Sequence, residues 1–252
     1  MRVIGIDIGG TAVKYGLLEE DGKLLESGEF ATEAGKGIDN LFNNMCKIID
    51  KYMSKDILGI AVSGTGQIDG SIGKVIGGNP IIPGWIGTNL VEKLETKYSL
   101  PAVLENDVNC AALGEKWLGA GKGAEGFVCL TIGTGIGGGI VLNGDIFRGD
   151  TCVAGEFGHI QIEKDGEQCL CGKKGCYERY ASATALVRMV KEKTGKELNG
   201  KEIFELEKSG DKEIKEVVDR WIDYFTDGLS TIVYIFNPSL VVIGGGVTKQ
   251  GD

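Results

Sequence analysis

The segment Arg2-Val-Ile-Gly-Ile-Asp-Ile-Gly-Gly-Thr-Ala-Val-Lys-Tyr-Gly-Leu-Leu18 decides the fold class of this chain of 252 residues. Its apolar residues 2–8 end at a Gly-Gly-Thr turn, and residues 12–18 resume a strand pattern, which predicts a β-hairpin. Asp21-Gly22 is a second turn signal, so a third strand is expected over residues 23–30. A helical period over 38–53 and an apolar run over 57–62 complete a β-β-β-α-β order.

The same order of patterns returns downstream. Residues 127–132, 137–142 and 145–147 predict three strands, and Ile132-Gly-Thr-Gly matches Ile8-Gly-Gly-Thr as an internal repeat. Between the copies we expect a strand over 102–105 and a helix over 108–118; after them, helices over 182–193, 201–208 and 211–236 and a strand over 240–243. A duplicated β-β-β-α-β-α unit predicts the α/β architecture of actin, Hsp70 and hexokinase, with a smaller lobe over 1–108, a larger one over 109–252 and the active-site cleft between them. Topology alone does not name a function.

Charge and composition exclude two kinds of partner. The formal net charge is −9, and no basic stripe with interleaved aromatic residues offsets it, so a nucleic-acid partner is not expected. No apolar run is long enough to span a membrane. Seven cysteines are an odd number and no signal peptide precedes them, so we expect reduced thiols and a cytoplasmic protein.

Two glycine turns are candidate phosphate-binding segments. They comprise Gly9, Gly10 and Thr11 after the first strand and Gly133, Thr134 and Gly135 after its repeat. Glycine lets backbone N–H groups approach phosphate oxygens closely. Either turn alone would more often be a plain hairpin, but two turns with threonine after buried strands favour phosphate binding.

Further candidate ligands lie near the turns. Asp7 is placed to hold Mg²⁺ through water, although a solvated carboxylate at a strand end is an equal alternative. Lys14 would reach a phosphate as a point charge, or is simply an exposed strand lysine. Gly244, Gly245 and Gly246 after the last strand would let adenosine lie against bare backbone; the alternative is an ordinary strand-to-helix turn.

The segment Leu104-Glu-Asn-Asp-Val-Asn109 ends a predicted strand and begins a predicted helix, where an α/β protein can place a reacting carboxylate. Asp107 would accept the proton of a substrate hydroxyl, and Asn106 would orient another hydroxyl. Asn and Asp are also favoured helix N-caps. Spacing alone therefore leaves the catalytic and the capping roles open.

A cluster of metal-binding residue types follows the single histidine, His159. Its members are Cys169, Cys171 and Cys176, in polar, glycine-rich sequence. Three thiolates and one imidazole complete a tetrahedral zinc shell without an open position, so we expect structural Zn²⁺. The alternative is three reduced cysteines packed as small apolar side chains. Glu156 and Glu178 lie on either side, which suits a ligand with many hydroxyl groups such as a sugar.

Together these segments resemble the ROK family of bacterial sugar kinases and sugar-responsive repressors. Asp7-Ile-Gly-Gly-Thr-Ala-Val-Lys14 is similar to the first phosphate motif of the family, and Glu105-Asn-Asp107 to its catalytic motif. Thr131-Ile-Gly-Thr-Gly-Ile-Gly-Gly138 is similar to the second phosphate motif, which adds Thr131 to the candidate nucleotide-binding residues. Gly155-Glu-Phe-Gly-His159 with the three cysteines resembles the zinc signature.

The resemblance implies that Asp107 is the general base. It also implies that His159 serves zinc and sugar through different nitrogens, and that the sugar hydroxyls are bound by Asn106, Glu156, His159 and Glu178. Gly78-Asn79-Pro80 and Pro83-Gly84-Trp85 match a family loop at the sugar pocket, which adds Asn79, although a turn closed by prolines also explains this segment. Homodimers are common in the family, so a homodimer is expected.

Two departures from the family matter. Repressor members carry a helix-turn-helix before the first strand, whereas here Met1 is followed almost at once by that strand, which disfavours DNA binding. The family usually continues through further helices, whereas this sequence ends at Asp252. The larger lobe and its adenosine site are therefore expected to be incomplete at the C-terminal end.

The sequence thus predicts ATP-dependent phosphorylation of a hexose at its 6-hydroxyl, glucokinase-like, with Mg²⁺ and structural Zn²⁺. Fructose, N-acetylmannosamine, N-acetylglucosamine and β-glucosides are alternative substrates. A non-catalytic sugar or nucleotide sensor and an actin-like or chaperone ATPase are the alternative classes.

Overall fold

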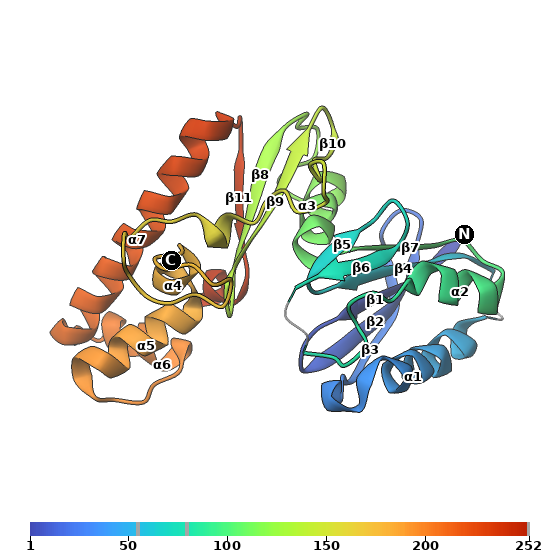
Figure 1. Ribbon diagram of the computed structural model, residues 1–252, viewed down its shortest axis with the longest axis horizontal. Coiled ribbons are helices and arrows are strands. Elements are labelled where there is room, and N and C mark those ends of the chain that lie inside the picture. The colour runs from blue at the N-terminus through green and yellow to red at the C-terminus, as the bar shows by residue number, and fades with distance from the viewer. Residues whose placement is uncertain (54–55, 79–80, 251–252) are drawn as a thin grey trace. The chain divides into compact units, whose positions relative to one another are not determined.

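The computed structural model describes residues 1–53, 56–78 and 81–250, and the chain forms two compact units (Figure 1). Unit 1 contains Met1–Cys110 and Arg148–Val153; unit 2 contains Ala111–Phe147 and Ala154–Asp252. The first boundary lies two residues after the expected division at 108–109, and residues 148–153 belong to the first unit. That these units are the lobes of a catalytic cleft stays a prediction.

Unit 1 is built on a five-stranded sheet in the order β3-β2-β1-β4-β7. Its strands are β1 (Arg2–Ile8), β2 (Ala12–Glu19), β3 (Leu24–Ala31), β4 (Ile57–Gly64) and β7 (Ala102–Asn106). β1 pairs antiparallel with β2 and parallel with β4, which pairs parallel with β7. Asp7, Ser63 and Glu105 therefore occupy one register row, next to the carboxyl ends of three parallel strands.

Helix α1 (Gly37–Tyr52) packs on this sheet through the apolar face that the sequence predicts. Leu41, Met45 and Ile49 are fully buried in one cluster with the apolar residues of β1 and β4. The sequence analysis did not predict η1 (Ala34–Lys36), α2 (Leu90–Tyr98) or the hairpin of β5 (Gln67–Asp69) and β6 (Lys74–Gly77). The side chain of Asn89 caps α2 by accepting from the N–H of Glu92.

Unit 2 repeats the sheet order of unit 1. Its sheet runs β10-β9-β8-β11 and comprises β8 (Phe127–Ile132), β9 (Ile136–Leu142), β10 (Asp145–Ile146) and β11 (Val241–Gly244). β8 pairs antiparallel with β9 and parallel with β11. The order corresponds strand by strand to β3-β2-β1-β4, so the internal repeat read from the glycine turns is confirmed.

The remaining elements are η2 (Phe157–His159), α4 (Glu178–Ala181), α5 (Ala183–Thr194), α6 (Gly200–Lys208), α7 (Lys212–Phe236) and η3 (Gly246–Gln250). Helix α3 (Asp107–Leu118) contains the first boundary between the units. Within unit 2, the long α7 runs beside the sheet (Figure 1) and buries Ile232 against residues of β8 and β9. It ends at Asn237, which adopts a left-handed conformation before Pro238.

The four cysteines outside the cluster, Cys46, Cys110, Cys129 and Cys152, occur singly in apolar sequence, which predicts core positions for all four. Cys46 and Cys129 are buried, as the apolar context predicts, whereas Cys110 and Cys152 are half-buried. Cys152 has a φ of 59° and its thiol hydrogen bonds to Asp69. A core position was therefore wrong for Cys152, because its thiol has a polar partner in a turn.

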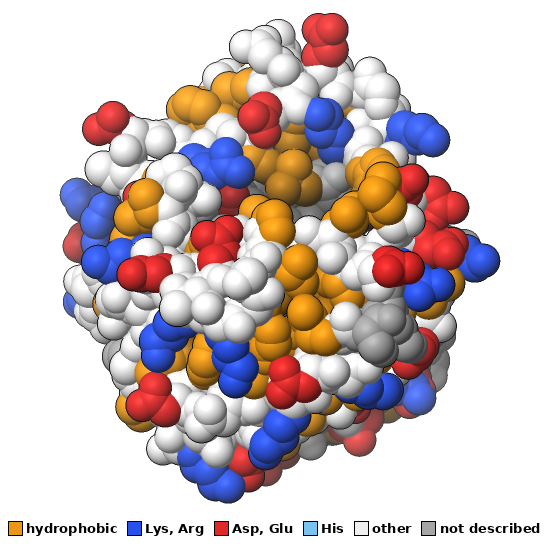
Figure 2. Space-filling view, turned by 90° about the vertical axis from the view of Figure 1, so that its right-hand side faces the viewer, with side chains coloured by type: hydrophobic (Ala, Val, Ile, Leu, Met, Phe, Trp, Pro, Cys, Tyr) orange, Lys and Arg blue, Asp and Glu red, His pale blue; other side chains and the backbone are white. Residues whose placement is uncertain are grey.

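The face shown in Figure 2 is chemically mixed. Lys and Arg side chains are interspersed with Asp and Glu, and apolar side chains gather between them. Among the described residues, no helix is both long enough and apolar enough to cross a membrane.

A glycine in α7 fixes the end of the cysteine-containing loop. Tyr177, directly after Cys176, is fully buried, and its hydroxyl donates to the carbonyl of Phe225 at 2.6 Å. A Cβ on Gly228 would overlap the Tyr177 ring. The loop thus ends on a ring that lies against bare helix backbone.

We expect Gly228→Ala to lower the midpoint of thermal unfolding. Overpacking costs about 1–3 kcal/mol, more than the roughly 1 kcal/mol that alanine contributes to a helix. The control is Gly114→Ala in α3, where a Cβ meets nothing within 4 Å; there the midpoint should rise. Differential scanning calorimetry measures both, and equal midpoints would contradict the packing argument.

Candidate functional site

The first glycine turn joins β1 to β2 next to the carboxyl edge of the unit 1 sheet. The N–H of Gly9 donates to the carbonyl of Ala12 at 3.1 Å, and the Thr32 hydroxyl donates to the carbonyl of Gly9 at 2.6 Å. A Cβ on Gly9 would lie 2.9 Å from the Ala12 oxygen, so close approach requires glycine here. Gly10 and Thr11 are exposed and open to a ligand.

Asp7 and Lys14 face each other across β1 and β2, and both are exposed. The Ser63 hydroxyl of β4 donates to Asp7 Oδ1 at 2.8 Å, which orients the carboxylate while leaving acceptor capacity. This arrangement offers oxygen ligands of the kind that Mg²⁺ prefers.

Asn106 carries out the capping role that the sequence left open. Its Oδ1 accepts from the N–H groups of Val108 at 2.9 Å and Asn109 at 3.2 Å, and its Nδ2 donates to the carbonyl of Gly66 at 3.0 Å. Asp107 Oδ1 accepts from the N–H of Val108 at 2.9 Å. The Asn106 side chain also contributes a hydrogen bond to the Asp107 carboxyl group, whose two oxygens retain acceptor capacity for a ligand.

The environment of Asp107 favours its neutral form. The residue lies at the surface of unit 1 but is crowded by protein atoms. This desolvation, with a smaller effect from the negative charge of Asp7, raises the pKa of Asp107, although hydrogen bonds from backbone N–H groups act in the opposite direction. A raised pKa suits a group that must accept a proton.

The second glycine turn lies beside the glycines of β11 in unit 2. The N–H of Gly133 donates to the carbonyl of Gly135 at 3.0 Å and closes the turn. Thr131 on β8 pairs in register with Gly244 on β11. Gly245 has a φ of 105°, and a Cβ there would overlap the backbone of Ile132. The candidate phosphate segment and the candidate adenosine segment of unit 2 therefore meet at the carboxyl ends of the parallel strands β8 and β11. Gly246, the last residue of the adenosine segment, is exposed.

The histidine and the three cysteines converge. Their ligand atoms all lie within 4.8 Å of one another, with 3.5 Å between the sulfurs of Cys171 and Cys176 and 3.6 Å between Cys169 Sγ and His159 Nδ1. Burial raises the pKa of Cys169 and Cys176, whereas the backbone N–H of Lys173 lowers the pKa of Cys171. A cation at the centre would favour the thiolate form of all three.

Glu156 and Glu178 lie on opposite sides of the imidazole. His159 Nε2 is 3.9 Å from Glu156 Oε2, and Nδ1 is 3.8 Å from Glu178 Oε1. Glu178 Oε1 is also 3.2 Å from Cys169 Sγ, and a Cβ on Gly135 would lie 2.6 Å from Glu178 Oε2. Glu178 therefore connects the cluster with the second glycine turn, while Glu156 is exposed.

Three glycines of the quoted motifs position this loop by close backbone packing. Gly155 has a φ of 91°, and Cβ atoms on Gly155 and Gly138 would each overlap the backbone of the other segment. A Cβ on Gly158 would overlap the carbonyl of Ile136. The segment 155–159 thus packs directly on the backbone of β9. The glycine run 137–139 inside a predicted strand was the available signal, because strand glycines mark close backbone approach.

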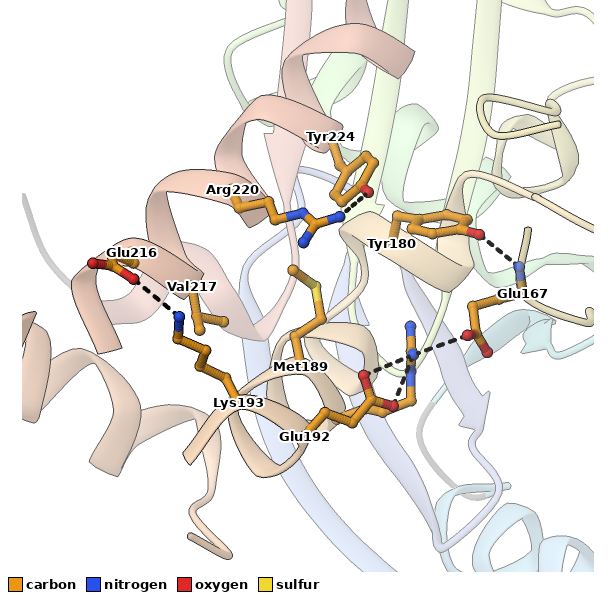
Figure 3. Close-up of a pocket in the computed structure, with 10 residues that line it drawn as sticks. Glu167, Tyr180, Met189, Glu192, Lys193, Glu216, Val217, Arg220 and Tyr224 are labelled. Carbon is orange, nitrogen blue, oxygen red and sulfur yellow. Dashed lines mark hydrogen bonds and ion pairs between the residues drawn. The ribbon is translucent and has the colours of Figure 1, made fainter. Parts of the chain in front are cut away.

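A pocket that the sequence did not predict lies elsewhere in unit 2 (Figure 3). It has a volume of about 500 Å³ and is lined mainly by α5 and α7. None of the predicted site residues lines it. Arg188 pairs with Glu192 at 3.1 Å and Lys193 with Glu216 at 3.1 Å, so much of the charge that lines the pocket is neutralised by these ion pairs.

Among the predicted site residues, Asn79 lies outside the described residues.

Comparisons with known proteins identify the family of this chain. The model of the ROK family matches residues 3–252. The chain is 33% identical to a glucokinase of Thermotoga maritima over 100% of this chain and 84% of the relative. It is 36% identical to a β-glucoside kinase of Listeria monocytogenes over 99% of this chain and 84% of the relative.

A solved structure shows the same fold. The ROK family glucokinase of Streptomyces griseus, in complex with glucose and AMPPNP, matches with a TM-score of 0.82 and 33% identity, covering 100% of this chain and 85% of that one. Each unit therefore belongs to the actin, Hsp70 and hexokinase class of ATPase folds that the repeat predicts. On its sequence motifs, its fold and its relatives, the chain belongs to the ROK family.

Proposed function

We propose that the protein transfers the γ-phosphoryl group of ATP to the 6-hydroxyl of a hexose, with glucose as the first candidate substrate. One observation carries the proposal: Asn106 caps α3 at the carboxyl edge of the unit 1 sheet, and the exposed carboxylate of Asp107 beside it retains acceptor capacity for a hydroxyl group. Similarity to proteins described as glucokinases supports the choice of sugar.

In the proposed reaction Asp107 accepts the proton of the 6-hydroxyl as that oxygen bonds to the γ-phosphorus and ADP leaves. The proton is released to solvent after transfer. The exposed N–H groups of Gly10 and Thr11 and the second turn at Gly133–Gly135 bind phosphate oxygens. Mg²⁺ bound near Asp7 would neutralise phosphate charge during transfer.

The cluster fits structural Zn²⁺. A tetrahedral ion with Zn–S near 2.3 Å and Zn–N near 2.0 Å places its ligand atoms about 3.5–3.8 Å apart, close to the 3.5 and 3.6 Å separations of the thiols and imidazole. The residues that would hold it are His159 through Nδ1, Cys169, Cys171 and Cys176. In this arrangement His159 Nε2, on the side of Glu156, is available to a sugar hydroxyl. Glu156 and Glu178 add carboxylate acceptors for further hydroxyls on the same part of unit 2.

Other sugars remain alternatives. Relatives described as β-glucoside kinases support β-glucosides, and fructose, N-acetylmannosamine and N-acetylglucosamine present a similar primary hydroxyl. A panel of these sugars in an ADP-coupled assay decides among them. A non-catalytic sensor would instead show sugar-dependent thermal stabilisation with no phosphorylated product. A homodimer and a cytoplasmic location stay predictions.

We expect Asp107→Asn to lower kcat by about 10²–10⁴-fold, because the amide cannot accept the proton. Sugar binding by calorimetry should change little. The unfolding midpoint at pH 7 should hold or rise, because a raised pKa means that folding disfavours the charged form at this position. The control is Asp145→Asn, whose Oδ1 accepts from the next backbone N–H at 2.7 Å in the same way. Full activity of Asp107→Asn would refute the assignment.

Loss of the metal should weaken sugar binding and stability together. We expect about one zinc per chain by elemental analysis, and Cys171→Ser should lose it, lower the unfolding midpoint and raise the sugar Kd about 10–100-fold. Cys152→Ser, outside the cluster, should retain both metal and affinity. A Cys171→Ser protein with unchanged metal content, midpoint and affinity would rule out the structural zinc site.

A further inference from the structure

Glu105 is a buried carboxylate directly before the residues proposed to act on the sugar. Its side chain on β7 is only 10% exposed. A charge in such a position is costly unless several donors satisfy it. Glu105 belongs to the Glu105-Asn-Asp107 motif, but its residue type and position in the motif do not indicate a role.

Backbone and side-chain donors satisfy both oxygens of the Glu105 carboxylate. Its Oε1 accepts from the backbone N–H of Asn106 at 2.9 Å and from Asn109 Nδ2 at 3.0 Å. Its Oε2 accepts from Arg148 Nε at 2.7 Å. We call Glu105, Asn106, Asn109 and Arg148 the Glu105 clamp.

The Glu105 clamp joins the residues on both sides of Asp107 by hydrogen bonds. Asn109 donates its backbone N–H to Asn106 Oδ1 and its side-chain amide to Glu105. The residue before Asp107 and the residue two positions after it are therefore joined to one carboxylate. Among the described residues no hydrogen bond joins Glu105 to Asp107, so the hydrogen-bonded link from Glu105 to the reacting group runs through the backbone of this turn.

The position of Arg148 in the Glu105 clamp depends on the segment that carries it and on Gly70. Arg148 begins the segment Arg148–Val153, which belongs to unit 1. A Cβ on Gly70 would lie 3.0 Å from Glu105 Oε2 and 3.4 Å from Arg148 Nε. Cys152, near the other end of this segment, hydrogen bonds to Asp69. The segment is thus attached at two points, and the missing side chain of Gly70 leaves space for the ion pair.

We propose that Glu105 is a positioning residue for phosphoryl transfer, which holds the Asn106–Asp107 turn in the geometry that proton transfer requires, and that Arg148 keeps it in place. The proposal rests on the proposed function for its kinetic consequence. Its structural consequence, the order of the turn, is independent of any substrate.

The test compares Glu105→Gln, Arg148→Met, Arg148→Lys and the control Glu95→Gln. Gln keeps the shape of Glu105 but replaces one acceptor by a donor. Glu95 is a matched control because its Oε1 accepts from the backbone N–H of Ala102 at 3.0 Å, at the other end of the same strand. Each kcat is divided by the fraction of protein that binds sugar. The unfolding midpoint of each variant shows whether it is folded at the assay temperature.

We expect kcat to fall about 10–100-fold in Glu105→Gln and Arg148→Met, because a displacement near 1 Å has an effect of this size, with the sugar KM within threefold. Arg148→Lys should restore most of kcat, since it keeps a charged donor. Hydrogen exchange by NMR, without substrate, should quicken at least tenfold at the amides of Asn106, Val108 and Asn109 in Glu105→Gln but not in Glu95→Gln.

The outcomes separate two failures. If the wild-type protein phosphorylates no sugar, the proposed function fails, and the exchange rates alone decide whether Glu105 orders the turn. If the wild type is active but Glu105→Gln keeps its kcat, or loses no more than Glu95→Gln, the positioning role is refuted. Unchanged exchange at the three amides refutes it equally.

Discussion

Parallel pairing of β1, β4 and β7 is the constraint on which unit 1 depends. Because parallel strands end at one edge, side chains distant in sequence reach a common row there: Asp7, Ser63 and Glu105. The glycine turn after β1 and the start of α3 after β7 then follow at the same edge of the sheet, with β4 between the two strands. Unit 2 uses the same geometry with β8 and β11, which bring its glycine segments together. Both units thus place short polar or glycine-rich segments at the carboxyl ends of buried strands.

Close backbone packing is the second constraint, and it acts mainly in unit 2. The segment 155–159 lies on β9 because Gly138, Gly155 and Gly158 have no Cβ atoms to separate the two backbones. This contact holds His159 and Glu156 next to the loop that contains the cysteines. Of the 42 glycines in the sequence, those in the two turns are proposed to let phosphate approach, whereas those around the cluster let one backbone approach another.

The sequence predicted the regular fold well because strong apolar periods and glycine turns mark it. β1 to β4, α1, β8, β9 and α7 are found within a residue or two of their expected bounds. The sequence did not predict the β5–β6 hairpin, because its strands have only three and four residues. It did not predict α2 either, because this helix buries only Leu90 and Leu94. The convergence of His159 with three cysteines followed from metal-ligand spacing. The contacts of Glu105 with Arg148 did not, because an ion pair between residues 43 positions apart leaves no local pattern.

The segment Arg148–Val153 has a consequence for the modularity of the chain. The polypeptide changes unit after residues 110, 147 and 153, so unit 1 is not a continuous stretch of sequence. A fragment ending at Cys110 would contain Glu105 without Arg148 and Asp69 without Cys152. Recombination between relatives at a single crossover after residue 110 would take Glu105 from one parent and position 148 from the other, which separates the two halves of unit 1. The two units are therefore expected to be inherited together, although each has its own sheet and core.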